Sequence, residues 1–203
     1  KKPEVMIQKL RPLSNILMQR TLIIAILAAA VGYSLMSFIM TATPLQIVNI
    51  CKLGNSASST VIQWHIIAMF APSFFTGSII SRFGNRKVML VGIILYAFSV
   101  FFGILGDTVL NFWIALFLCG LGWNFLYVGG SDIIAKSALP EELAKVQGVT
   151  DFIIFVFVAM GSFLAGYLHS NLGWEIMLFY TIIPILLIFI GIIIIKPQNL
   201  KLN

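Results

Sequence analysis

Long apolar segments alternate with short polar breaks along nearly the whole chain. A helix that crosses the hydrocarbon core of a membrane needs about 20 mainly apolar residues. Six segments come close to this length, at 21–43, 61–80, 88–105, 110–134, 149–168 and 174–195. Each break holds the glycine, asparagine, proline or charged residues that end helices. The pattern predicts an all-α membrane protein with six transmembrane helices over residues 21–195, after a basic connector over 1–20 and before a tail over 196–203.

The composition excludes most other classes of protein. Of the 203 residues, 60% are hydrophobic and only 10% are charged, whereas soluble domains carry about 25% charged residues. The apolar content excludes a disordered chain, and two cysteines are too few for a disulfide scaffold. The basic residues are scattered, so we expect no nucleic-acid partner. The lipid bilayer is the expected surroundings of this chain.

The distribution of cations predicts how the helices are oriented. Short loops rich in Lys and Arg stay in the cytoplasm, and all 13 such residues except Lys52 fall on one side of the six predicted helices. We therefore expect a multi-pass membrane protein with both termini in the cytoplasm. The chain begins Lys-Lys-Pro and shows no signal-peptide pattern, so we expect it to be part of a longer polypeptide.

The break between the second and third predicted helices contains a recognisable motif. It reads Gly77, three further residues, Ser81, Arg82, Phe83, Gly84, Asn85, Arg86, Lys87. This resembles the signature loop of the major facilitator superfamily, with Ser81 in place of the aspartate and Asn85 in place of the first basic residue. A degenerate copy of this loop is typical of the second half of these transporters. The resemblance implies a carboxyl-terminal six-helix bundle whose partner is an amino-terminal six-helix half, in the same polypeptide or a separate chain, because alternating access moves one bundle against the other.

Two pairs of potential metal ligands lie in the first two predicted helices. Met36 and Met40 are four residues apart, and so are His65 and Met69, which places each pair on one helix face. Thioether sulfur favours Cu(I), and imidazole also binds copper. Neutral ligands would let the ion leave again, as transport requires. The other interpretation is packing, because methionine commonly fills gaps between apolar helices.

The same two pairs are similar to the motifs of the CcoA-type copper importers, a branch of the major facilitator superfamily. The resemblance implies that Met36, Met40, His65 and Met69 bind copper as the transported ion, that no resident cofactor is required, and that the copper supplies cbb3-type cytochrome oxidase. The branch also includes riboflavin carriers, so an organic cargo is the alternative. Aromatic and amide side chains would then line the cavity, with Trp64, Phe70, Trp123, Asn124 and Tyr127 as candidates.

Several other residues are candidates for smaller roles. Cys51 lies in a predicted outer loop and could capture copper or respond to redox conditions, although a lone cysteine is no motif. Ionisable residues in membrane helices are functional candidates. A possible cytoplasmic gate comprises Arg82, Arg86, Lys87, Asp132 and Asp151. Pairing of the two aspartates with Lys136 or Lys145 is the structural alternative.

The sequence argues against an enzyme. Gly129-Gly130-Ser131 matches the Gly-x-Ser of intramembrane serine proteases only superficially, because the last predicted helix contains no histidine to act as its base. No Gly-x-x-x-x-Gly-Lys motif of an ATPase occurs. A secondary transporter is the remaining expectation.

Overall fold

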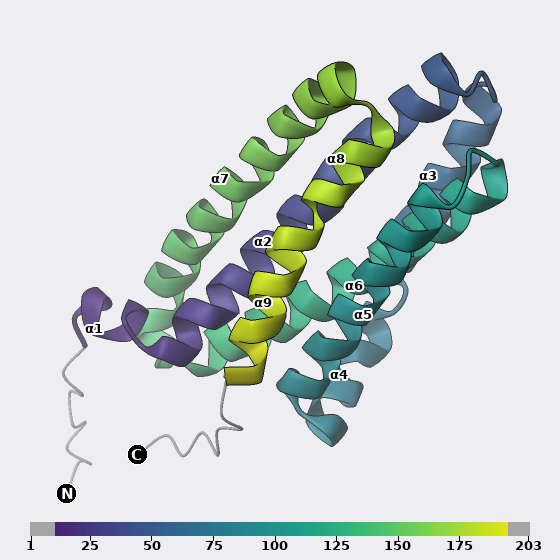
Figure 1. Ribbon diagram of the computed structural model, residues 1–203. Helices are drawn as coiled ribbons and strands as arrows, with labels where there is room; N and C mark the ends of the chain where they lie inside the picture. The colour runs from purple at the N-terminus through teal and green to yellow at the C-terminus, as the bar shows by residue number, and fades with distance from the viewer. Residues whose placement is uncertain (1–10, 195–203) are drawn as a thin grey trace, which may run out of the picture.

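The computed structural model describes residues 11–194, which form helices and no strands (Figure 1). The elements are α1 (Leu13–Leu17), α2 (Arg20–Pro44), the π-helix η1 (Leu45–Ile50), α3 (Asn55–Phe70), α4 (Ser73–Phe83), α5 (Asn85–Ile104), α6 (Val109–Lys136), α7 (Pro140–Leu172), α8 (Trp174–Tyr180) and α9 (Ile182–Ile194). The all-helical prediction is confirmed. Residues 1–10 of the predicted connector and the predicted tail lie outside the described residues.

The number of membrane spans depends on how one bent helix pair is counted. Five helical segments are long and apolar enough to cross a membrane, and α3 with α4 makes a sixth if the pair is one span. The two helices meet at an angle of 42°. Pro72 lies in the break between them, and proline removes a main-chain donor from a helix. The predicted helix at 61–80 is thus two helices rather than one.

The predicted break at 136–145 is wrong for most of its length. Helix α7 begins at Pro140, and only Ser137–Leu139 separate it from α6. Proline is well tolerated in the first turn of a helix. Glu141 and Glu142 follow it there, where the helix dipole stabilises carboxylates. The Glu142 carboxylate also accepts a hydrogen bond from the Leu139 N–H at 3.1 Å. Charged residues that suggested a loop therefore begin a helix.

Helix α6 lies at the centre of the bundle and packs on α2, α3 and α5. Small residues allow this close approach. A side chain added at Gly92 of α5 would lie 3.0 Å from the Gly122 carbonyl oxygen of α6. A side chain added at Gly122 would in turn lie 3.0 Å from the Gly92 carbonyl oxygen. Helix α2 packs on α7 as well as on α6, and its Ser34 hydroxyl donates to the Phe157 carbonyl oxygen at 2.8 Å.

Cations mark one end of the bundle, which we call the basic end. It contains α1, the α4–α5 turn and the α6–α7 turn, in the lower part of Figure 1. Lys52 lies at the opposite end, after η1. At the basic end Arg11 binds Glu142 through both its main-chain N–H, at 2.8 Å, and its guanidinium, at 2.6 Å. This attaches the described part of the connector to the first turn of α7.

Candidate functional site

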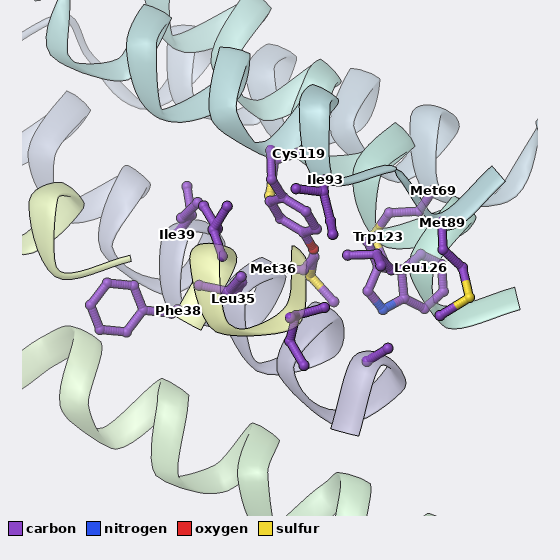
Figure 2. Packing of buried hydrophobic residues seen from close by; sticks show 14 of the residues in the cluster. Leu35, Met36, Phe38, Ile39, Met69, Met89, Ile93, Cys119, Trp123 and Leu126 are labelled. Atoms are coloured by element: carbon purple, nitrogen blue, oxygen red, sulfur yellow. The ribbon is translucent and has the colours of Figure 1, made fainter. Parts of the chain in front are cut away.

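The four predicted copper ligands lie in the interior of the bundle. Met36 and Met40 are one turn apart on α2, and His65 and Met69 are one turn apart on α3. His65 is completely buried, Met36 and Met69 are nearly so, and Met40 is half-buried. Both Met36 and Met69 belong to the main hydrophobic core (Figure 2). However, α3 packs chiefly on α6 and makes little contact with α2. Within residues 11–194, His, Cys, Asp and Glu form no cluster of three that could hold a metal ion, so a metal site there would have to use methionine sulfur.

The imidazole of His65 has one bonded nitrogen and one free nitrogen. Its Nδ1 lies 2.7 Å from the carbonyl oxygen of Leu116 on α6. A carbonyl only accepts hydrogen bonds, so Nδ1 carries the hydrogen and Nε2 has a lone pair. Nε2 is buried and has no hydrogen-bond partner. This arrangement is common in metal-binding histidines, whose second nitrogen is oriented by a main-chain carbonyl.

Five aromatic side chains from four helices, one of them α3, contact one another in the bundle. We call Tyr33, Phe70, Trp123, Tyr127 and Phe155 the aromatic cluster. The rings of Trp123 and Tyr127 are stacked, with centroids 5.1 Å apart, and Tyr33 meets both edge-on at 5.3 Å. Phe70 lies edge-on to Trp123 at 5.8 Å, and Phe155 is tilted against Tyr33 at 5.9 Å. The cluster therefore joins α2, α3, α6 and α7.

The indole N–H of Trp123 is the polar group of this cluster that lacks a partner. Trp123 is 5% exposed, and its Nε1 is buried without a hydrogen-bond acceptor. Buried donors are almost always paired in folded proteins, so an unpaired one calls for a partner. Tyr33 and Tyr127 are half-buried, and Phe70 and Phe155 are the exposed members of the cluster.

Sequence reasoning identified part of the aromatic cluster. It selected Phe70, Trp123 and Tyr127 but missed Tyr33 and Phe155. The available signal for Tyr33 was its spacing of three residues from Met36, which places both on one face of α2. Trp64 was selected but lies elsewhere, edge-on to Trp113 at 5.8 Å and 44% exposed.

Asn124 is buried and bonded to the break between α3 and α4. Its Nδ2 donates to the carbonyl oxygen of Met69 at 2.7 Å and to the Ser73 hydroxyl at 2.6 Å. Its Oδ1 accepts from the Thr76 hydroxyl at 2.6 Å. The side chain is fully occupied by these contacts, which stabilise the bent helix pair.

The predicted gate residues separate into two groups. Asp132 accepts a hydrogen bond from Asn85 at 2.9 Å and pairs with Lys136. Arg86 donates to the carbonyl oxygen of Ile193 on α9 at 2.7 Å. These two residues join helices of this bundle to one another. Arg82, Lys87 and Asp151 are exposed and form no ion pair within residues 11–194.

Cys51 lies at the opposite end of the bundle, directly after η1. The Gln46 amide lies between two residues there, since its Nε2 donates to Cys51 Sγ at 3.5 Å and its Oε1 is 3.0 Å from His169 Nε2. Burial raises the pKa of the Cys51 thiol above its ordinary value, and the nearby Asp107 carboxylate raises it further. The thiolate is the metal ligand and the nucleophile, and a raised pKa lowers its fraction at neutral pH.

Comparison with known proteins identifies the family. A profile of the Major Facilitator Superfamily matches residues 21–201. The chain belongs to this superfamily. It is 40% identical to the riboflavin transporter RfnT of Brucella anthropi over 192 residues, which cover 93% of the chain and 48% of that protein. It is also 32% identical to the uncharacterized MFS-type transporter YddS of Bacillus subtilis, over 70% of the chain and 33% of that protein.

Membership in the superfamily confirms the coarser predictions, a multi-pass membrane protein of a transporter family rather than an enzyme family. The chain spans about half the length of RfnT and about a third of YddS. The predicted copper cargo receives no support from these relatives. RfnT, which is similar over nearly the whole chain, is described as a carrier of an organic molecule.

Proposed function

We propose that this chain forms one bundle of a secondary transporter for a flat aromatic molecule of the riboflavin type. The observation that carries the proposal is the aromatic cluster, in which rings of α2, α3 and α6 contact the ring of Trp123, whose buried indole N–H has no partner. Flat rings stack on Trp and Tyr with a gain beyond that of burial alone. The edge of a flavin ring carries carbonyl oxygens that accept hydrogen bonds. The similarity to RfnT supports the same class of cargo.

We expect the members of the aromatic cluster to have separate roles in binding. Trp123 would donate from Nε1 to an acceptor at the edge of the cargo, and Tyr127 and Tyr33, which are half-buried, would contact its faces. Asn124 follows Trp123 on α6 and is bonded to the α3–α4 break. Movement of that break would therefore be transmitted to the aromatic cluster.

Uptake by a riboflavin-requiring bacterium tests this function. The gene would be expressed in a strain that cannot synthesise or import riboflavin, and initial uptake of labelled riboflavin would be measured. Trp123→Phe keeps a ring and removes only the N–H. We expect its KM to rise by about tenfold at most, the value of one hydrogen bond. Trp113→Phe is the matched control, because Trp113 stacks with Phe117 outside the aromatic cluster. Absence of riboflavin uptake by the wild type would refute the proposal.

Copper transport is a second candidate, supported by the free Nε2 of His65. This buried nitrogen has a lone pair and its ring is oriented by the Leu116 carbonyl, and Met36, Met40 and Met69 offer the soft ligands that Cu(I) prefers. Competition with a chromogenic Cu(I) chelator would measure binding to the purified protein. Copper would be favoured if the wild type binds one Cu(I) and if this binding is lost both in the double variant Met36→Ser, Met40→Ser and in the single variant His65→Ala. Riboflavin uptake that persists in the methionine variant would favour the organic cargo.

We also propose a second six-helix half as the partner of this bundle, in the same polypeptide or as a separate chain. The family fold and the length relative to RfnT support this. Of the predicted gate residues, the exposed Asp151 is available for a contact with such a partner. The segregation of cations supports a location in the bacterial inner membrane with the basic end in the cytoplasm. Labelling a cysteine placed at Lys52, in a variant in which Cys51 is replaced by serine, with a membrane-impermeant reagent in intact cells would test that orientation.

A further inference from the structure

An apolar groove opens on the surface of the bundle near its basic end. It lies between α4, α5 and α6 and has a volume of about 400 Å³. Its lining consists of Ile79, Phe83, Lys87, Val88, Val91 and Phe125. Lys87 is the one polar side chain in this lining. The groove lies apart from the aromatic cluster and from the methionine and histidine pairs, none of which contributes to it.

The lining surface is apolar throughout, and Lys87 lines one end of the groove with the aliphatic stem of its side chain, which ends in the ammonium group. Lys87 lies in the first turn of α5, and Val91 lies one turn further along, about 6 Å deeper at 1.5 Å per residue. Phe125 of α6 lies at the same depth, since it contacts the position of Gly92. The groove therefore has a cationic mouth at the basic end and an apolar interior toward the centre of the bundle.

A second cation is held at the mouth. The guanidinium of Arg82 lies over the ring of Phe83, 5.3 Å from its centroid, and Phe83 lines the groove. Neither Arg82 nor Lys87 forms an ion pair with any residue between 11 and 194. The nearby Asp132 is already bonded to Asn85 and Lys136, and Arg86 is directed to α9. Two cations that form no ion pair within residues 11–194 thus lie next to the groove, Lys87 as part of its lining and Arg82 against the ring of Phe83.

We propose that this groove is a binding site for one anionic phospholipid. An acyl chain would lie along Val91 and Phe125, and the phosphate would pair with Lys87 and Arg82. The charge gradient is what selects this occupant, because an anionic head and an apolar tail match the two ends of the groove. Basic residues at the membrane surface attract anionic lipids. A helix of another protein is the alternative occupant, but it does not separate a charged end from an apolar end in this way. The groove lining also offers such a helix no hydrogen-bonding side chain besides Lys87.

Native mass spectrometry of the purified protein would test the site with phosphatidylglycerol. We expect one phosphatidylglycerol to remain bound in preference to phosphatidylcholine. Lys87→Gln should weaken its binding about fivefold, the effect of one cation near a membrane surface. Arg20→Gln is the matched control, because Arg20 is exposed at the same end but lies outside the groove, and we expect unchanged binding.

A groove-filling variant separates this site from general attraction of anionic lipid to the basic end. Val91→Trp keeps both cations and occupies the apolar interior. Val91 is 45% exposed, so the variant should fold, and it should lose the retained lipid. Equal retention of phosphatidylglycerol by Val91→Trp and the wild type would overturn the proposal. So would equal affinity for phosphatidylcholine, or a Lys87→Gln variant that binds like Arg20→Gln.

Discussion

Asn124 of α6 donates a hydrogen bond to the main-chain carbonyl oxygen of Met69 in the last turn of α3, over 2.7 Å. The chain bends by 42° just beyond Met69, where Pro72 has no N–H to continue the helical ladder. Asn124 also binds Ser73 and Thr76 on the far side of the bend. In a membrane the freed main-chain groups of a broken helix must find partners inside the protein. One amide side chain provides that partner here.

Removing this amide should destabilise the bundle. Asn124→Ala removes the amide donor from the Met69 carbonyl in the interior, while the Thr76 hydroxyl keeps the Pro72 carbonyl oxygen as an acceptor. We expect a loss of about 1–3 kcal/mol in the free energy of unfolding. Thermal unfolding of the detergent-purified protein would measure it. Asn171→Ala is the control, because Asn171 is exposed and bonds only within its own helix. Equal stability of Asn124→Ala and the wild type would show that the bend needs no such support.

The contact between α2 and α7 should be sensitive to the size of one residue. A side chain added at Gly161 would lie 2.9 Å from the main-chain oxygen of Ser34 and would also meet the Ser34 hydroxyl. Gly161→Val should therefore separate the helices and cost about 1–3 kcal/mol. Gly166→Ala, five residues later on α7, meets no atom within 4 Å. It should stabilise the helix by up to about 1 kcal/mol. Equal effects of the two variants in thermal unfolding would contradict the close packing.

The helices were predictable because lipid imposes a simple requirement on the sequence. Each crossing segment must be apolar over about 20 residues, and this is visible without knowledge of any contact. The first and last residues of each helix were harder to predict, and the start of α7 shows why. Glu141 and Glu142 have the charge of a loop, yet they are stabilised by a helix N-terminus and, for Glu142, by Arg11, 131 residues away. A contact over that separation leaves no local signal.

The candidate site was predictable only in part for the same reason. The spacing of His65 and Met69 shows that they share a face of α3, but not which helix that face contacts. The structure directs His65 to Leu116 of α6. Likewise, the amide of Asn124 predicted an interior position, but its partners lie 48 to 55 positions earlier in the chain. Residue type indicated burial, and only the packing shows the partner.

The signature loop should depend on the backbone of one glycine. Gly84 has φ +84°, a conformation that strains other residues, and no atom lies within 4 Å of the position of an added side chain. Gly84→Ala should therefore cost about 1–3 kcal/mol through backbone strain alone. Gly77→Ala in the same motif is the control, since Gly77 is helical and equally uncrowded. Thermal unfolding should show a loss of stability for Gly84→Ala and none for Gly77→Ala. The opposite order would contradict the strained backbone conformation at Gly84.

The reactivity of Cys51 should show a raised pKa. Burial is the larger cause and the Asp107 carboxylate the next, and both disfavour the thiolate, which is the form that reacts. The alkylation rate should therefore reach half its maximum at a higher pH than for an exposed peptide thiol. Asp107→Asn removes the negative charge, so this midpoint should move to lower pH, whereas Asp151→Asn, which lies on α7 near Tyr127, should leave it unchanged. Iodoacetamide labelling at a series of pH values would measure the midpoint, with Cys119 unreactive because it is completely buried. A midpoint at or below that of the peptide thiol would contradict the raised pKa and would favour a role of Cys51 in metal capture.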